Sequence, residues 1–172
     1  MDIVAESFFG KKESRDMAAI ISVAVIIGIF ALDSVIKGYI EAHVEEGSTT
    51  KKLGGHILIR RHHNRGAMLN AGQYKRRLVA FVSVVVLLGA LTAFVLTIGK
   101  KGCGLLRAGL TLILGGGFSN TCDRLKRKYV VDYISFPVKW EWLRNIVFNL
   151  SDFCIMAGAC LVLLSGLTEG AK

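Results

Sequence analysis

Hydrophobic residues along the chain gather into four long runs, and the segments between them are polar and mostly basic. The runs cover approximately residues 17–40, 78–98, 103–119 and 146–167. A helix needs about 20 predominantly apolar residues to cross roughly 30 Å of hydrocarbon. The pattern therefore predicts an all-α membrane protein with four transmembrane helices. The first run follows basic residues, but no small-residue cleavage site comes after it, so we predict a retained helix rather than a signal peptide.

Two polar segments separate these runs and predict what lies outside the membrane. In the first, residues 41–77, polar and apolar residues alternate from His56 to Arg60, which predicts a short strand, and HHNRG predicts a turn after it. The second covers residues 120–145. Residues 1–16 are mixed and predict a tail at the membrane surface. We expect a single domain, residues 1–172, with a small β-containing extracytoplasmic element.

Composition agrees with this class and narrows the partners. The chain is 52% hydrophobic, with a mean hydropathy of +0.49, which is high for a soluble domain. The formal net charge is +9, but the basic residues lie in loops between apolar runs. Such loops favour contact with anionic lipid headgroups over contact with nucleic acid. The predicted partners thus include membrane lipids and no nucleic acid.

Cysteine and histidine spacing predicts no metal and no cofactor. The four cysteines, Cys103, Cys122, Cys154 and Cys160, form no CxxC pair and are expected to be small buried hydrophobic residues. His62 and His63 are adjacent, without a partner four residues away or an acidic cluster at ligand spacing. A phosphate-binding glycine loop is also missing from the sequence.

Two aspartates, Asp132 and Asp152, stand at the edges of apolar segments. A carboxylate near hydrocarbon is costly and usually functional. Asn120 and Arg124 are four residues apart, and Asn149 and Asp152 are three apart, so each pair shares a helix face. Two carboxylates in one site hold one proton between them, as acid–base chemistry requires. On spacing alone, a catalytic pair, an ion or proton pathway and a structural polar cluster all remain open.

Another pair of charges lies near the end of the first run. Asp33 and Lys37 are one helical turn apart, where opposite charges can pair. On its own, this spacing indicates an interfacial ion pair that ends the helix.

The motifs around these residues resemble those of the lipoprotein signal peptidases, also called signal peptidase II. GGGFSNTCDRL, YVVDYISF and FNLSD are similar to the GNxxDR, VVDF and FNxAD elements of that family, in the same order. Upstream, LDSVIK resembles the first-helix D-x-x-x-K element, and NRGAM resembles the N-x-G-A element. The five elements together cover nearly the whole chain.

The resemblance implies a membrane aspartic endopeptidase of the bacterial cytoplasmic (inner) membrane. Such an enzyme removes signal peptides from diacylglyceryl-modified prolipoproteins, cutting before the lipidated cysteine with an aspartate-activated water and no metal or cofactor. It implies that Asp132 and Asp152 are the catalytic pair. Its other matched positions are expected to bind substrate or support the site: Asn64, Gly66, Asn120, Arg124, Asn149, Asp123, Asp33 and Lys37.

The chain departs from the family pattern at several positions. Ser135 replaces a second acid that often follows the first, and Ser151 replaces the alanine of FNxAD. Arg65 takes the place of a small residue, and Met68 that of a common aromatic. These departures affect the substrate-contacting loop more than the aspartate pair.

Charge counting disagrees with the orientation that the resemblance implies. That orientation is multi-pass, with the active site toward the extracytoplasmic face and the tails and the 99–107 loop in the cytoplasm. Lysine and arginine number eight in residues 41–77 and six in 124–145, against seven in the tails and the 99–107 loop together. We expect a monomer in the family orientation. The alternative function is a non-catalytic membrane protein or transporter that binds lipid or protons with the same polar cluster.

Overall fold

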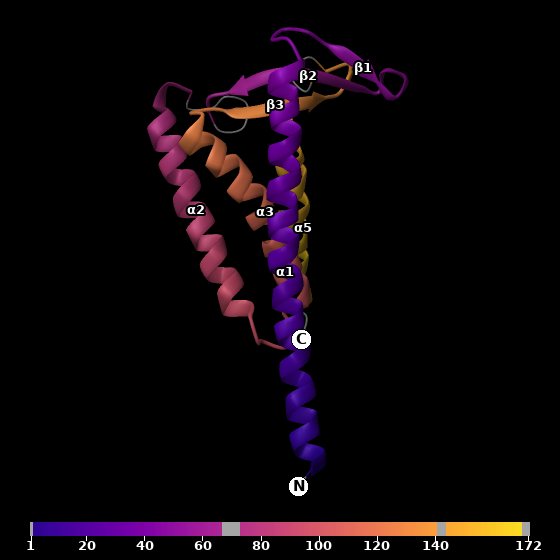
Figure 1. Ribbon diagram of the computed structural model, residues 1–172, viewed down its shortest axis with the longest axis vertical. Coiled ribbons are helices and arrows are strands. Elements are labelled where there is room, and N and C mark those ends of the chain that lie inside the picture. The colour runs from indigo at the N-terminus through magenta and orange to yellow at the C-terminus, as the bar shows by residue number, and fades with distance from the viewer. Residues whose placement is uncertain (1, 67–72, 141–143, 170–172) are drawn as a thin grey trace.

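The computed structural model describes residues 2–66, 73–140 and 144–169. Four long helices run alongside one another beneath a small sheet: α1 (Asp2–His43), α2 (Arg76–Thr97), α3 (Gly104–Lys126) and α5 (Leu150–Glu169). Figure 1 shows the sheet lying across one end of the helices, with the start of α1 at the opposite end. Short 3-10 turns, η1 (Leu53–Gly55) and η3 (Gln73–Lys75), complete the described elements.

The outer faces of the helices are apolar and open. Ile20, Ile27, Val86 and Leu163 each expose 60% to 70% of their surface. Apolar area of this extent needs a nonaqueous environment. Within the described residues, three helical segments are long and apolar enough to cross a membrane: Arg15–His43, Arg76–Thr97 and Leu150–Thr168. The prediction of a multi-pass helical membrane protein is supported for these three spans.

Helix α3 is the central helix, since it packs against α1, α2 and α5. Its sequence contains polar and charged residues through its second half, and for that reason it is not among the three apolar spans. Leu110, Leu114 and Phe94 of α2 form a buried apolar cluster around it. The polar half, from Ser119 onward, is also largely buried. This helix therefore carries polar side chains into the interior of the bundle.

Glycines let α3 and α5 approach until their backbones touch. A Cβ at Gly109 would lie 2.7 Å from the carbonyl oxygen of Gly158, and one at Gly158 would lie 2.5 Å from that of Gly109. A Cβ at Gly116 would collide with the Ser151 carbonyl oxygen. Small residues permit this kind of close helix packing. Gly116 of the GGG run therefore packs directly against the backbone of α5.

The sheet has three antiparallel strands in the order β1 (Thr50–Lys52), β2 (Ile57–Asn64) and β3 (Val130–Ser135). His62 lies opposite Asp132 and Asn64 opposite Val130, with a register irregularity between Ile59 and His62. Strand β3 is almost wholly buried, because Val131 and Tyr133 pack against Ile40 near the end of α1. The sheet is thus fixed to the helix ends.

Three expected boundaries near the N-terminal half are wrong. Residues 2–16, expected to be a surface tail, continue α1 as helix. The first span ends at His43, beyond the Asp33–Lys37 pair that was expected to end it. The HHNRG segment begins in strand, since His62, His63 and Asn64 belong to β2. Pairing with β3 holds these residues extended where local sequence indicated a turn.

Two helix boundaries near the site also differ from those expected. The third helix was expected to end at residue 119, but α3 continues to Lys126, so Asn120 and Arg124 are helical. The fourth was expected to begin at residue 146, but α5 begins at Leu150, so Asn149 precedes it. The cysteines are free thiols: Cys103, Cys122 and Cys154 are half-buried and Cys160 is exposed, so their expected burial is wrong for Cys160.

Replacing Gly116 with alanine should destabilise the protein, because the new methyl group meets backbone of α5 that cannot rotate away. We expect a loss on the order of 1–3 kcal/mol, typical of overpacking, seen as a lower unfolding temperature in detergent. Gly117→Ala is the matched control, since its Cβ would meet only the Leu87 side chain, at 3.0 Å. Equal losses in the two variants would contradict backbone contact at Gly116 as the constraint.

Candidate active site

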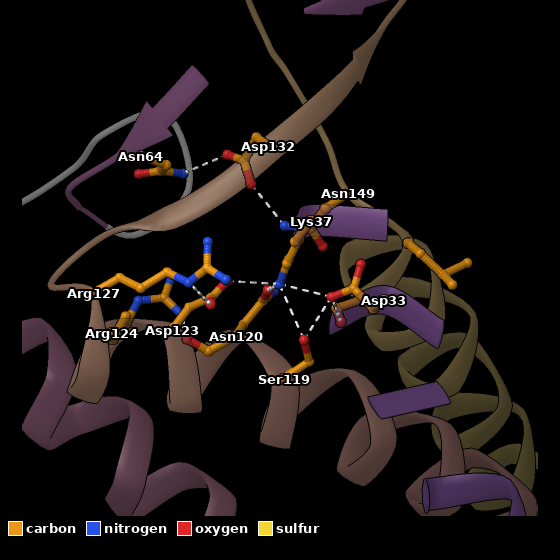
Figure 2. Close-up of polar contacts among 12 residues, drawn as sticks. Asp33, Lys37, Asn64, Ser119, Asn120, Asp123, Arg124, Arg127, Asp132 and Asn149 are labelled. Carbon is orange, nitrogen blue, oxygen red and sulfur yellow. Dashed lines mark hydrogen bonds and ion pairs between the residues drawn. The ribbon is translucent and has the colours of Figure 1, made fainter. Parts of the chain in front are cut away.

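Asp132 lies in the middle of β3, with only 2% of its surface exposed. Its carboxylate accepts hydrogen bonds from two side-chain amides: Asn64 Nδ2 at 3.0 Å and Asn149 Nδ2 at 2.7 Å. Antiparallel pairing of β2 with β3 brings Asn64 close, and Figure 2 shows its amide directed at Asp132. A buried carboxylate needs such donors, because burial without partners is costly.

Asp152 occupies the first turn of α5 and takes part in its N-terminal cap. Asn149 Oδ1 accepts a hydrogen bond from the Asp152 backbone N–H at 2.9 Å, and Asp152 Oδ2 accepts one from the Asn149 backbone N–H at 3.0 Å. This reciprocal pair is a capping box with aspartate in the third helical position. The helix N-terminus therefore fixes where the Asp152 carboxylate lies.

Asn149 connects the two aspartates. Its side-chain oxygen caps α5 while its side-chain nitrogen donates to Asp132. The preceding residue, Phe148, forms backbone hydrogen bonds of 2.7 Å in both directions with Ile134 of β3. Because this bridge holds the start of α5 against β3, the two carboxylates belong to one site.

Two residues of α3 complete the shell around Asp152. Asn120 Nδ2 donates to Asp152 Oδ1 at 2.9 Å. Arg124, one turn further, donates to the Asn120 carbonyl oxygen at 3.3 Å and to the Gly66 carbonyl oxygen at 3.4 Å. The Gly66 backbone N–H donates to Asn64 Oδ1 at 3.1 Å, which turns the amide nitrogen of Asn64 toward Asp132. Gly66 thus orients a ligand of one aspartate.

Beneath the aspartates lies a buried charge network around Lys37 (Figure 2). Lys37 Nζ is 2.7 Å from Asp33 and 3.0 Å from Asp123, and it donates to Asn120 Oδ1 at 2.8 Å. Lys37 and Asp33 are 1% and 0% exposed. Local spacing indicated an interfacial ion pair, but the pair is buried inside the protein. A buried charge is tolerated when it is paired and hydrogen-bonded, so this network holds α1 against α3.

Three hydroxyl groups, which sequence reasoning did not assign, converge on Asp33. Ser119 and Ser151 each donate to Asp33 Oδ2 at 2.6 Å, and the Tyr133 hydroxyl donates to Oδ1 at 3.1 Å. The Tyr133 oxygen in turn accepts the backbone N–H of Leu150, the first residue of α5, at 3.0 Å. Their positions next to Asn120, Asp132 and Asp152 were the available signal. Through these hydroxyls, α1 also supports the start of α5.

Two cavities meet at the site. One, of about 200 Å³, is lined by both aspartates together with Asn64 and Arg124. The other, of about 440 Å³, lies between α2 and α3 and is mostly apolar, with Leu78, Val82 and Val86 on one wall and Leu87 and Ile113 deeper in. It reaches Asn120, Arg124 and Asp152 at its polar end. An apolar chamber therefore opens onto the paired carboxylates.

Burial raises the pKa of Asp132 from its ordinary 3.8 to about 7, and the charge of Asp152 acts in the same direction. The hydrogen bonds from Asn64 and Asn149 lower it but do not cancel the effect. Near neutral pH, the pair can therefore hold one proton. A protonated carboxyl beside an ionised one can serve as general acid and general base in the same site.

The predicted site residues divide into two groups. The first group surrounds the two aspartates, Asp132 and Asp152, and consists of Asn64, Gly66, Asn120, Arg124 and Asn149. The second group forms the charge network below them and consists of Asp33, Lys37 and Asp123. Ser135 is buried on β3, with its hydroxyl 3.5 Å from the Leu58 carbonyl oxygen. Ala67 and Met68 lie outside the described residues.

His63 of the histidine pair connects the sheet to the end of α1. His63 Nε2 is 2.8 Å from Glu41 Oε1, and its ring stacks on Tyr129 with a centroid distance of 4.1 Å. Across residues 2–66, 73–140 and 144–169, no three His, Cys, Asp or Glu side chains are grouped to hold a metal ion.

Comparison with solved structures identifies the class of protein that has this fold. A structure described as a bacterial membrane enzyme, obtained by the in meso method at 2.3 Å resolution, matches with a TM-score of 0.73. The match covers 87% of this chain and 88% of the other, at 20% identity, and so concerns the fold alone. This chain therefore shares the fold of that membrane protein.

Sequence comparison then gives the family. The family described as Signal peptidase (SPase) II matches residues 25–168, and the chain belongs to it. A lipoprotein signal peptidase of Caldicellulosiruptor bescii is 32% identical over 148 residues, covering 86% of this chain and 91% of the relative. One of Streptococcus pneumoniae is 28% identical over 151 residues, covering 88% and 94%. The resemblance seen in the motifs is confirmed.

Substitution can separate the two roles of Asn149, as the cap of α5 and as a hydrogen-bond donor to Asp132. Asn149→Ala removes the cap and should lower the free energy of unfolding by about 1–2 kcal/mol. Asn149→Ser keeps an oxygen that can cap α5 and should recover most of that loss, although it cannot supply the amide that reaches Asp132. Thermal unfolding in detergent measures both. If serine were as destabilising as alanine, Asn149 would not act as the cap.

Proposed function

We propose that the chain is an aspartic lipoprotein signal peptidase that hydrolyses prolipoproteins immediately before a diacylglyceryl-modified cysteine. The observation that carries the proposal is the junction of the buried Asp132 and the half-buried Asp152 through Asn149 at the end of an apolar cavity. Membership of the signal peptidase II family and relatives named lipoprotein signal peptidase support the substrate class.

The surroundings of the two aspartates favour different roles. Asp152 accepts hydrogen bonds from a backbone N–H and from Asn120 at the N-terminus of α5, where the helix dipole favours negative charge. Asp132 lies in a strand, and its pKa of about 7 leaves a large fraction of it protonated at neutral pH. In our proposal Asp152 is the general base and Asp132 the general acid.

The proposed reaction follows from these roles. Asp152 takes a proton from water as the oxygen attacks the scissile carbonyl carbon, and Asp132 gives its proton to the carbonyl oxygen. When the C–N bond breaks, Asp152 passes its proton to the leaving nitrogen. Asp132 recovers a proton from the hydroxyl of the collapsing intermediate, so the pair returns to its starting state. Arg124, between the two cavities, is placed to donate to a substrate peptide carbonyl.

The apolar cavity supports a lipidated substrate. Its walls come mainly from α2 and α3, and most of the side chains that line it are apolar. Acyl chains or the apolar part of a signal peptide would remain surrounded by hydrocarbon there, while the peptide bond lies beside the aspartates. A water-soluble peptide would gain nothing from such walls.

We also propose that α3 is a fourth membrane crossing. It starts shortly after α2 ends, at the end of the bundle away from the sheet, and it leads to β3 within the sheet. At 1.5 Å per residue, a helix of 23 residues is roughly 34 Å long, enough to cross the ~30 Å hydrocarbon core. The family orientation in the cytoplasmic membrane then puts the sheet and the aspartates toward the extracytoplasmic face. The basic outer segments contact lipid headgroups.

Substitution of either aspartate should abolish cleavage. Asp132→Asn and Asp152→Asn should each lower kcat by at least about 10²–10⁴-fold, because each removes a general acid or base, with purified protein and a diacylglyceryl-modified prolipoprotein in detergent. The control is Asp16→Asn, an exposed aspartate on α1. Normal cutting by either site variant would exclude the proposed mechanism. An inert wild type with intact lipid binding would favour the non-catalytic alternative.

The pH dependence of cleavage should show a descending limb near neutrality. Asp132 must be protonated to act as the acid, so kcat/KM should fall as pH rises through about 7, the pKa of Asp132. The rate is measured from pH 5 to 9 with a substrate that has no titratable group next to the scissile bond. A rate that stays constant to pH 9 would contradict assignment of the acid to Asp132.

A further inference from the structure

We infer that a second, separate groove on the sheet side of the helices binds an anionic phospholipid. This groove encloses about 660 Å³ between the start of α2 and the end of α3. Five basic side chains line it: Arg65, Arg76, Arg77, Arg124 and Lys128. Among the described residues, no acidic side chain lines the groove. We call it the basic groove.

The remainder of the basic groove is apolar. Val79, Ala80, Phe81 and Val84 continue along α2 away from the sheet, and Leu125 faces them from α3. Phe81 is 65% exposed and Leu125 is 51% exposed. Positive charge at the sheet end and hydrocarbon below it match the two parts of a phospholipid, a phosphate ester and an acyl chain.

The basic groove is distinct from the apolar cavity that leads to the aspartates. The cavity uses the face of α2 that carries Val82 and Val86, whereas the groove uses the face that carries Phe81 and Val84. Neither aspartate lines the groove. The two spaces share Arg124 and Val79, so a bound lipid would lie beside the substrate without occupying its place.

Three of the five basic side chains in the basic groove have no ion-pair partner among the described residues. Arg76 and Arg77 form the first turn of α2, which contains no acidic residue. Within the described part of the chain, no carboxylate lies within 4.0 Å of the cationic nitrogens of Arg76, Arg77 or Lys128. Cations at a helix N-terminus are unfavourable because they oppose the helix dipole. A phosphate placed there would interact favourably with the helix dipole and would reduce the repulsion among the basic side chains.

A phospholipid fits this groove better than an acidic peptide does. An acidic peptide could neutralise the arginines, but it would leave the exposed Phe81 and Leu125 without apolar contacts. The groove also includes Arg76 and Arg77 at the start of α2, where one of the three apolar spans begins, and this is the position expected for lipid headgroups. The ligand is therefore assigned by its chemistry: a negatively charged phosphate with attached acyl chains.

Lipid binding can be tested without measuring peptidase activity. The purified protein is placed in phosphatidylcholine nanodiscs containing a minor fraction of phosphatidylglycerol, and retained lipids are identified by native mass spectrometry. Wild type should retain phosphatidylglycerol in preference to phosphatidylcholine. The double variant Arg76→Gln/Arg77→Gln should lose roughly 30-fold in that preference, given a contribution of about fivefold for each basic residue near an anionic surface.

The control is Lys51→Gln/Lys52→Gln, which removes the same charge from the exposed strand β1. It should retain the wild-type preference. Equal loss in both double variants would show diffuse surface charge and overturn the proposal, as would a wild type without preference. Full competition by glycerophosphoglycerol, which has no acyl chains, would show a phosphate site only and overturn the assignment of a lipid. Failure of the proposed peptidase function would leave these outcomes unchanged.

Discussion

The arrangement of the site depends on the side-chain amide of Asn149. Because this one group makes two hydrogen bonds, the two partners must lie next to each other. Its oxygen accepts a hydrogen bond from the Asp152 backbone N–H in the first turn of α5, which has no partner within the helix. Its nitrogen donates a hydrogen bond to the buried carboxylate of Asp132 on β3. The Phe148–Ile134 backbone bridge holds Asn149 next to β3, where both hydrogen bonds form. Asp152 is then positioned by the same cap. Helix initiation and the pairing of the aspartates are consequently one structural event.

Below this junction, the protein buries charge in order to fix helix ends. Lys37 lies between Asp33 and Asp123, and hydroxyls from α3, β3 and α5 converge on Asp33. Such a network contributes little net stability, because desolvation offsets the attraction between charges, but removal of one partner leaves another charge unpaired. Glycine contacts between α3 and α5 add a steric constraint of a different kind. The polar contacts determine how the helix ends are oriented, and the glycines determine how closely α3 and α5 pack.

Much of this architecture could be predicted from the sequence because bilayer thickness sets the length of an apolar run. The three apolar spans were predicted from hydropathy and the pairing of Asn149 with Asp152 from spacing, whereas the grouping of both aspartates with Asn120 was implied by the family resemblance. The ends of the helices were not, because a cap such as Asn149 depends on contacts with β3 that no local pattern contains. The extended conformation of His62–Asn64 depends on pairing with β3 in the same way. Tyr133 and Ser151 were missed as partners of Asp33 because residues 100 and 118 positions apart meet there.

That last separation has a consequence for how the protein is made. Asp33 emerges from the ribosome early, yet the hydroxyl of Ser151 and the capped turn of Asp152 belong to the final helix. Asn64 on β2 and Asn120 on α3 are also made before their partners, because they donate to Asp132 and Asp152, which come later in the chain. A nascent chain therefore enters the membrane with Lys37 and Asp33 only partly compensated. The centre exists only after the last helix has been inserted, so a chain interrupted before α5 contains Asp132 without Asp152 and lacks half of the pair on which the proposed chemistry depends.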